Sequence, residues 1–152
     1  MRKSLKMLFA IQAAAIAVAL CCSDASAVTW DNAWFSGDKT DAYLSESYGA
    51  GGIQLGVSGF PNMEWNDTKY SDGAWTEVNK WSGHCLDSNS NGKVYPHGCI
   101  GGDRYQRWYE ISTPTGWALE DEATGLFLDC DNSHGVYTNR NYGDRDSHQR
   151  WH

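Results

Sequence analysis

The chain has 152 residues, with 12 basic and 19 acidic side chains and a formal net charge of −7. Such an acidic chain repels phosphate backbones and anionic lipid surfaces, so neither nucleic acid nor a membrane surface is an expected partner. All eight Trp, all eight Tyr and all 16 Gly lie after residue 27. This composition favours strands and turns, and it supplies aromatic side chains for core packing or for stacking on sugars.

The first 27 residues have the layout of a secretory signal. Three basic residues precede an apolar run over 7–20, and Ala25-Ser26-Ala27 offers a small-x-small cleavage site. The run is shorter than the roughly 20 residues that a membrane span needs. We therefore expect a signal peptide over 1–27, secretion to an extracellular location and no membrane insertion. Residues 28–152 are then long enough for a single domain.

Short strand-like runs, separated by clusters of Gly, Asn, Asp and Ser, occupy this domain. Residues 28–40 and 66–74 read as connecting loops, the second of which contains the glycosylation sequon Asn66-Asp67-Thr68. The clearest strand-like runs are Trp75–Val78, Gly92–Tyr95, Arg107–Ile111, Trp117–Leu119 and Leu126–Asp129. Several short strands at this spacing predict an all-β barrel or sandwich.

One repeat organises these runs. Three tryptophans lie at intervals of 43 residues and register three copies, namely Trp65, Trp108 and Trp151. The copies extend over about 28–70, 71–112 and 113–152. Because one copy cannot bury its apolar face alone, three copies predict closure with pseudo-threefold symmetry.

The first copy keeps the apolar positions of the repeat and loses the polar ones. Leu44-Ser45 stands where the other copies have Leu-Asp, and Met63-Glu64-Trp65 stands for Gln-Arg-Trp. Gln54 takes the place of a tyrosine that both other copies have. We interpret the first copy as kept for packing and not for binding.

Three cysteines follow the expected signal peptide, and an oxidising compartment favours their pairing. Cys85 and Cys99 bracket a short loop, so we expect a disulfide between them. Closing a loop of ~15 residues stabilises a fold by about 3 kcal/mol in the chain-entropy model. Cys130 is then left over, either as a buried thiol or as an intermolecular link.

The second copy carries a family resemblance. Cys85-Leu86-Asp87, Gly92-x-Val-Tyr, Cys99-x-Gly-Gly and Gln106-Arg107-Trp108 resemble the ricin B-type lectins, and their wording is most similar to the actinohivin-like bacterial lectins. The resemblance covers about 41–152 and is strong in copies two and three. It implies a β-trefoil fold, a core position for the tryptophan of each Gln-x-Trp motif, and a shallow sugar pocket on each intact repeat.

A sugar pocket needs a carboxylate to accept hydroxyl hydrogen bonds, an aromatic ring for the apolar sugar face, and an amide that both donates and accepts. The resemblance implies these carbohydrate-binding residues in copy two: Asp87, Tyr95, His97, Tyr105 and Gln106. In copy three it implies Asp129, Tyr137, His148 and Gln149, together with Asn141, for which Asn139 competes. Ile100 departs from the family pattern, which has Asn after the second cysteine.

Each of these residues also has a purely structural interpretation. Asp87 and Asp129 can cap turns, and the two tyrosines on the Val-Tyr runs can be half-buried strand residues. Gln106 and Gln149 can hold the main chain of a loop, which is the role we favour for them. His97 can be an ordinary loop residue.

The leading functional hypothesis is a secreted lectin that binds mannose-, galactose- or xylan-type glycans without a cofactor. We expect no metal site, because no histidine pair shows zinc-ligand spacing with matching cysteines. We expect no enzyme, because Asp87 and Asp129 lie in different repeats, too far apart to flank one glycosidic bond. The alternative is a protein-interaction module, such as a protease inhibitor or a host-directed effector, acting through loops 28–42 and 60–74. The oligomeric state stays open.

Overall fold

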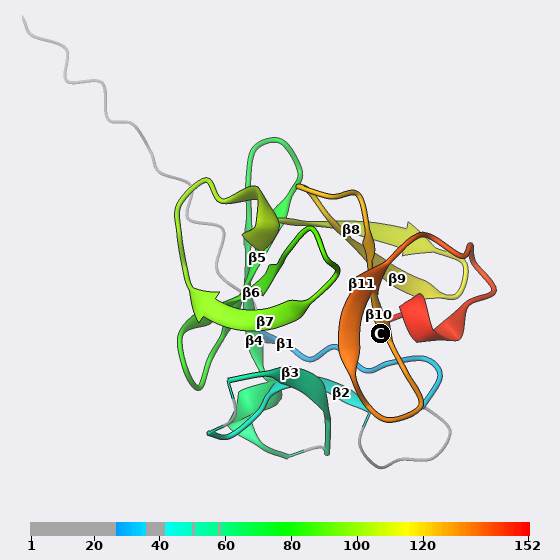
Figure 1. Ribbon diagram of the computed structural model, residues 1–152, viewed down its shortest axis with the longest axis horizontal. Coiled ribbons are helices and arrows are strands. Elements are labelled where there is room, and N and C mark those ends of the chain that lie inside the picture. The colour runs from blue at the N-terminus through cyan, green and yellow to red at the C-terminus, as the bar shows by residue number, and fades with distance from the viewer. Residues whose placement is uncertain (1–26, 36–41, 50, 58) are drawn as a thin grey trace, which may run out of the picture.

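The computed structural model describes residues 27–35, 42–49, 51–57 and 59–152 (Figure 1), and the expected signal peptide lies outside them except for Ala27. Within these ranges the chain forms strands and short 3-10 helices, with no α-helix. The strands are β1 (Ala27–Val28), β2 (Tyr43–Glu46), β3 (Ile53–Gly56), β4 (Trp65–Lys69), β5 (Trp75–Asn79), β6 (His84–Ser88), β7 (Val94–Gly98), β8 (Trp108–Thr113), β9 (Gly116–Asp121), β10 (Phe127–Cys130) and β11 (Val136–Asn139). The 3-10 helices are η1 (Pro61–Met63), η2 (Arg104–Gln106) and η3 (Ser147–Gln149). No helix in the described ranges is both long and apolar enough to cross a bilayer.

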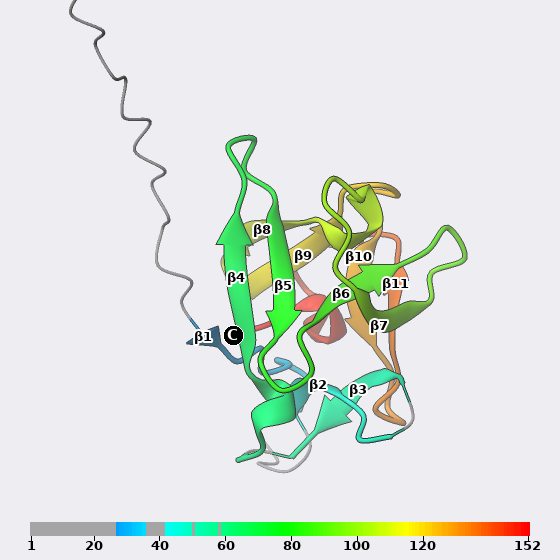
Figure 2. The same cartoon turned by 90° about the vertical axis from the view of Figure 1, so that its left-hand side faces the viewer.

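A barrel forms from antiparallel strands and is closed by residues near both ends of the described chain. β1 pairs with β4, β4 with β5, β5 with β8, and β8 with β9. Trp151 then bridges both Trp117 on β9 and Asn32. The main chains of Asp31 and His152 exchange hydrogen bonds of 3.0 and 2.8 Å. The C-terminus accordingly lies beside β1 and β4 in Figure 2.

Three hairpins cover one end of this barrel: β2–β3, β6–β7 and β10–β11 (Figure 1). The second and third hairpins meet through a bridge between Lys93 and Tyr137 and through the Thr138 amide, which donates to the Gly92 carbonyl at 2.8 Å. Gly92 has a φ of 81°, and a Cβ at this residue would lie 2.7 Å from the Thr138 carbonyl oxygen. Only glycine therefore fits where the two hairpins touch.

The three repeat tryptophans lie at the centre of the core, fully buried. Each indole Nε1–H donates to the carbonyl oxygen of the leucine in its own hairpin. The distances are 3.0 Å from Trp65 to Leu44, 3.0 Å from Trp108 to Leu86, and 3.3 Å from Trp151 to Leu128. A closed barrel, three hairpins and one contact repeated in every copy define a β-trefoil, which confirms the fold that the resemblance implied.

The prediction of a loop over 66–74 is wrong for residues 66–69, which belong to β4. β4 extends to Lys69 and pairs in register with β5, from Trp65 opposite Asn79 to Lys69 opposite Trp75. Only a tight turn over 70–74 joins the two strands, and it extends beyond the rest of the barrel in Figure 2. The sequence did not indicate this strand because its buried residue Asp67 is polar. A half-buried strand is recognised by alternating apolar residues, and Asp67 breaks that alternation.

The loop expected over 28–40 also takes part in pairing where it is described. Val28 pairs with Trp65, and Asp31 bridges Tyr43. Residues 36–40 of this expected loop lie outside the described residues. The N-terminal segment is thus part of the barrel wall.

Cys85 and Cys99 form the expected disulfide, which links β6 to the residue after β7. Cys130 is the free cysteine of the described residues and is buried on β10. Burial raises the pKa of its thiol to about 12, and the neighbouring carboxylate of Asp129 acts in the same direction. Cys130 is therefore a buried, unreactive thiol.

Candidate functional site

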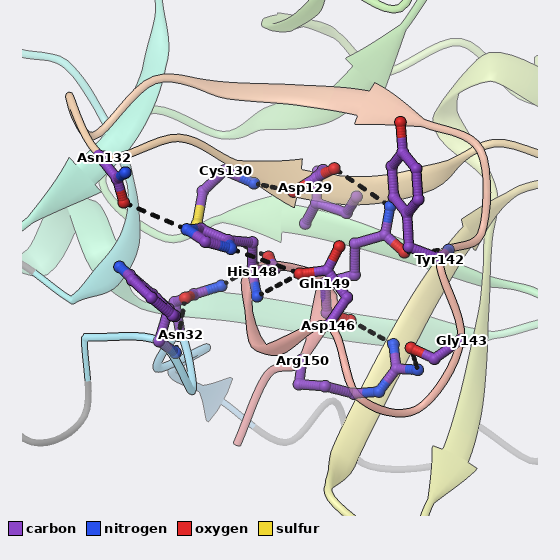
Figure 3. Close-up of polar contacts among 12 residues, drawn as sticks. Asn32, Asp129, Cys130, Asn132, Tyr142, Gly143, Asp146, His148, Gln149 and Arg150 are labelled. Carbon is purple, nitrogen blue, oxygen red and sulfur yellow. Dashed lines mark hydrogen bonds and ion pairs between the residues drawn. The ribbon is translucent and has the colours of Figure 1, made fainter.

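A hollow of about 300 Å³ lies in the third repeat, between hairpin β10–β11 and the segment that leads through η3 (Figure 3). It is lined by Asp129, Cys130, Asp131, Asn132, Tyr137, Asn139, Tyr142, Asp146 and His148. Carboxylates, amides and aromatic rings therefore share one concave surface. These are the groups that sugar binding requires.

The carboxylate of Asp129 is held on both oxygens. Oδ1 accepts a hydrogen bond from the Cys130 amide at 2.8 Å, and Oδ2 accepts one from Gln149 Nε2 at 3.1 Å. Gln149 is fully buried and also donates to the Arg140 carbonyl at 2.8 Å, while its Oε1 accepts from the Tyr142 amide at 3.1 Å. Gln149 thus fixes the acid to the loop after β11, which is the main-chain role that we favoured for it.

The imidazole of His148 forms one wall of the hollow and is held from several sides (Figure 3). Asp146 caps η3 by accepting from the His148 amide at 3.1 Å, and its Oδ1 lies 3.3 Å from Nδ1 of the ring. Nε2 lies 3.2 Å from Asn132 Oδ1. The indole of Trp34 stacks on the His148 ring, with ring centroids 4.3 Å apart and ring planes at 22°. The orientation of His148 is therefore well defined.

The second repeat has the same pairing of acid and amide. Gln106 Nε2 donates to Asp87 Oδ2 at 2.8 Å and to the Gly98 carbonyl at 3.1 Å, and its Oε1 accepts from the Ile100 amide at 2.8 Å. Replacing the family's Asn by Ile100 therefore keeps the main-chain contact. His97 Nδ1 lies 3.3 Å from the same oxygen of Asp87.

The two tyrosines expected at the second-repeat site lie on different elements, and Tyr95 is the one opposite Asp87 in the β6–β7 ladder. Tyr95 is partly buried on β7, and its hydroxyl donates to the Ser88 carbonyl at 3.1 Å. Its ring lies edge-on to His97, with centroids 6.3 Å apart. Tyr105 lies partly exposed on η2, whose cap Asp103 accepts from the Tyr105 amide at 3.0 Å. The Tyr95 side chain is thus held by a main-chain carbonyl of β6, and the main chain of Tyr105 is held by the side chain that caps η2.

The first repeat also contains a hollow, of about 360 Å³, which the sequence did not predict. Ser45 takes the position of Asp129 in it, and Gln54 takes that of Tyr137. Its lining residues are Ser45, Tyr48, Gln54, Leu55, Gly56, Val57, Phe60 and Asn62. None of these is a carboxylate, so the first repeat keeps the concave shape without the charged acceptor.

Burial controls ionisation in the third-repeat hollow. It raises the pKa of Asp129 above the ordinary value, and the hydrogen bond from Gln149 acts in the opposite direction. Burial also raises the pKa of Tyr137 to about 12, assisted by the charge of Asp129, so its phenol stays protonated at neutral pH. The lining includes three carboxylates, Asp129, Asp131 and Asp146, and no Lys or Arg among the residues described there. The hollow therefore has a negative potential.

The structure brings Asp129, Tyr137 and His148 to the hollow, with Gln149 behind the acid. Asn141 is not among the lining residues. Its Oδ1 accepts from the Gly143 amide at 2.7 Å and shapes the loop, while the competing residue Asn139 lines the hollow.

Sequence reasoning missed five lining residues: Cys130, Asp131, Asn132, Tyr142 and Asp146. Asp146 caps η3 three residues before Gln149, as Asp103 caps η2 in the second repeat, so a repeated cap was visible in the sequence. Asp131 and Asn132 lie in the turn between β10 and β11. Asp and Asn are common in turns, so their presence there did not point to a binding site.

No protein-family model matches the sequence, and no curated protein matches it at a significant level. Solved structures do match. The Polyporus squamosus lectin, bound to the human-type influenza-binding epitope Neu5Acα2-6Galβ1-4GlcNAc, superposes with a TM-score of 0.70 at 17% identity over 84% of this chain and 48% of the lectin. The designed threefold-symmetric protein ThreeFoil gives a TM-score of 0.62 at 22% identity over 81% of this chain and 94% of its own. A Clostridium perfringens endo-β-galactosidase that releases GlcNAcα1-4Gal gives 0.69 at 15% identity over 83% of this chain and 31% of the enzyme.

At these identities the likeness shows the fold, and it confirms the β-trefoil. The chain spans less than half the length of the galactosidase and of the Polyporus lectin, and nearly the whole of ThreeFoil. β-Trefoil lectins and carbohydrate-active proteins are among these structural neighbours.

Proposed function

We propose that this chain is a secreted, ricin B-type carbohydrate-binding protein that binds neutral glycans non-covalently through its third and second repeats. One observation carries the proposal. In both repeats a buried aspartate of the hairpin is held by a buried glutamine from the following 3-10 helix, at 2.8 Å for Asp87 and Gln106 and at 3.1 Å for Asp129 and Gln149. The basic and apolar layout of residues 1–27 and the disulfide support secretion.

The chemistry of the third repeat suits a pyranose. An ionised carboxylate has about four acceptor positions, and Asp129 uses one on each oxygen for the protein. The remaining positions can accept two neighbouring sugar hydroxyls, and a charged acceptor strengthens such bonds. Tyr137, Tyr142 and His148 provide rings for the apolar sugar face. We expect each shallow site to be weak and two sites to act through avidity.

The charge of the hollow selects among glycans. Asp129, Asp131 and Asp146 all line it, so a sialic acid or uronic acid in the hollow would bring a fourth carboxylate among them. Like charges at short range in a partly buried site repel strongly. The preferred ligands are therefore neutral hexoses or pentoses, of the mannose, galactose or xylan type.

Binding without catalysis fits the way these carboxylates are used. Asp129 is bonded to Gln149 and a main-chain amide, and Asp131 accepts from the main-chain amides of the β10–β11 turn at 2.7 and 3.0 Å. Asp146 caps η3. A glycosidase needs one carboxyl group free to donate a proton and a second free to attack or to activate water. Each acid in this hollow instead accepts hydrogen bonds from the protein itself.

A glycan array with the chain from residue 28 onward tests the proposal. Asp129→Ala should remove binding at the third repeat, Asp87→Ala should weaken avidity, and the double variant should be inactive. Asp144→Ala is the matched control, because this exposed acid lies outside the hollow. An array on which the unaltered protein binds no glycan would contradict the proposal.

A protein-interaction module is the second candidate, and two exposed rings favour it. Trp34 is 51% exposed, and Phe60 is 50% exposed beside the hollow of the first repeat. If a protein partner binds these rings, Phe60→Ala should abolish its capture while Asp129→Ala leaves it intact. The glycan-binding proposal requires the opposite result on immobilised glycans.

A further inference from the structure

Three carboxylates meet inside the barrel, on strands that take no part in the hairpin hollows. Asp67 on β4, Glu77 on β5 and Glu110 on β8 each place one carboxylate oxygen within 4.8 Å of the other two. Asp67 lies directly opposite Glu77 in the β4–β5 ladder, and β8 pairs with β5 on its other side. Three neighbouring strands thus direct acids to one point.

In the other two repeats, the position equivalent to Glu77 is occupied by an apolar core residue. The register of the barrel strands gives the position of Glu77 to Leu119 in the third repeat and to Trp30 in the first, each lying two residues after the partner of a repeat tryptophan. Both of those residues belong to the hydrophobic core. Glu77 is itself fully buried. A carboxylate has therefore replaced a core side chain at this position.

Three buried oxygens of the cluster have no donor from outside it among the described residues, because their polar neighbours are the other carboxylates of the cluster. Oε2 of Glu77 accepts from Trp30 Nε1 at 3.2 Å, whereas its Oε1 receives no hydrogen bond from any described residue outside the cluster. The same holds for Oδ1 of Asp67, a residue that is 8% exposed, and for Oε1 of Glu110. Trp30 thereby fixes the Glu77 carboxylate with its free oxygen toward the cluster.

No arginine or lysine forms an ion pair with the cluster among the described residues. Lys69 acts on Glu110 through its charge, but its Nζ lies over the ring of Trp75, 4.9 Å from the centroid. Removing a carboxylate from water without a partner is costly. A group of three such acids needs positive charge from outside the protein, or protons.

We propose that Asp67, Glu77 and Glu110 bind a divalent cation, and that the cation is Ca²⁺. Ca²⁺ is coordinated by oxygen alone at about 2.3–2.6 Å, so oxygens that share one ion lie up to about 5 Å apart, as these do. Zinc prefers nitrogen and sulfur ligands, which the cluster lacks, and Mg²⁺ demands a more rigid octahedron. Glu110 is partly exposed, so water can reach the ion from its side and complete the coordination shell.

This site is separate from the glycan hollows. The sequence-based expectation of no metal site did not consider these three acids. That expectation rested on the spacing of histidine and cysteine, whereas this ligand set is all carboxylate and spread over three strands. The competing explanation is that the three acids share protons. Burial raises the pKa of Glu77 well above its ordinary value and that of Glu110 to about 7, so protons are available to them near neutral pH.

Thermal unfolding of the chain from residue 28 onward, at pH 7.5 in EDTA, CaCl2 or MgCl2, distinguishes the two explanations. We expect 10 mM CaCl2 to raise the Tm by on the order of 5 °C, for a Kd between about 0.1 and 1 mM. Mg²⁺ should have less effect. Tb³⁺ should replace Ca²⁺ and emit when tryptophan is excited, because the indole of Trp30 is hydrogen-bonded to Glu77.

Glu77→Gln keeps the shape of the side chain and removes its charge, so the variant should lose both the Ca²⁺ response and the Tb³⁺ emission. Glu110→Gln, at a partly exposed position, serves as the second variant if the first fails to fold. Glu64→Gln is the matched control, because this acid pairs with Lys80 outside the cluster. The proposal is overturned if the unaltered protein shows no response to Ca²⁺, since the acids then share protons. It is equally overturned if the response persists in Glu77→Gln and Glu110→Gln, since the ion then binds elsewhere.

Discussion

Trp34 stacks on His148 across the junction of the first and third repeats, with ring centroids 4.3 Å apart. The N-terminal segment therefore contributes to the edge of the third-repeat hollow, although Trp34 does not line it. Trp81 occupies the equivalent position beside the first-repeat hollow, where it meets Tyr48 with centroids 4.6 Å apart. Ala123 has this position beside the second repeat, so that repeat lacks the additional ring.

Trp34→Ala should weaken glycan binding at the third repeat while the fold persists. The stacked pair contributes about 1 kcal/mol, and its loss frees the His148 ring, so the Kd should rise roughly fivefold. Because Trp34 is 51% exposed, the free energy of unfolding should change by less than about 1 kcal/mol. Titration of a monovalent glycan in an Asp87→Ala background isolates the third repeat. Trp81→Ala is the control and should leave this Kd unchanged.

Glycan binding should depend on pH through Asp129. The ionised carboxylate is the form that accepts two hydroxyls, and burial raises its pKa, with the Gln149 hydrogen bond opposing the rise. Binding at the third repeat should therefore be complete at neutral pH and fall as the pH drops through this raised pKa. The loss begins at a higher pH than for a solvent-exposed aspartate. Calorimetric titrations between pH 7 and pH 4, with circular dichroism to verify folding, measure it. Asp129→Asn should show weak binding without this pH dependence.

Gln149→Met installs in the third repeat the residue that the first repeat has at this position, Met63. The substitution leaves Asp129, the Arg140 carbonyl and the Tyr142 amide without their shared partner. Unsatisfied buried groups cost about 1–3 kcal/mol each, partly offset by the apolar methionine, so we expect a net loss of about 2–3 kcal/mol. Urea denaturation measures this loss, and glycan binding at the third repeat should disappear. Gln54→Ala, at an exposed position, should stay within about 0.5 kcal/mol of the unaltered protein.

Much of the fold could be predicted because the repeat encodes it. Trp65, Trp108 and Trp151 occupy equivalent positions, each donating to a hairpin leucine, and such large buried side chains leave a regular trace in the sequence. β4 could not be recognised in the same way. Its inward-facing residue Asp67 is polar, and its partner Glu77 lies ten positions further along. An acid that is buried through contact with another acid leaves no local pattern.

The site was predicted in part for a similar reason. Asp129 and Tyr137 lie on paired strands, where the repeat fixes the register, and the structure brings them together. The sequence left Asn139 and Asn141 as alternatives for the amide of the pocket, because a loop follows β11. Sequence alone does not say which of the two side chains points into the hollow. Trp34 reaches His148 only because the barrel closes between the N-terminal segment and the last repeat. Contacts of this kind depend on tertiary structure alone.

Removing the disulfide should affect stability and the second repeat, and not the third. Cys99 lies between Gly98 and Ile100, whose main-chain groups both bond Gln106, so the bridge to Cys85 anchors the loop that holds this glutamine. A closed loop of this length stabilises by about 3 kcal/mol. The double variant Cys85→Ala/Cys99→Ala should lose that amount in urea denaturation and bind more weakly through the second repeat.

The third repeat supplies the control for this prediction. Asn141 takes the place of Cys99 there and shapes the same loop through its hydrogen bond to the Gly143 amide at 2.7 Å. Because no disulfide holds that loop, binding by the cysteine double variant in an Asp87→Ala background should equal that of Asp87→Ala alone. A third-repeat Kd that also rose would show that the disulfide supports the whole trefoil and not one loop. Asn141→Ala should produce the converse pattern, with weaker binding at the third repeat and an unchanged second repeat.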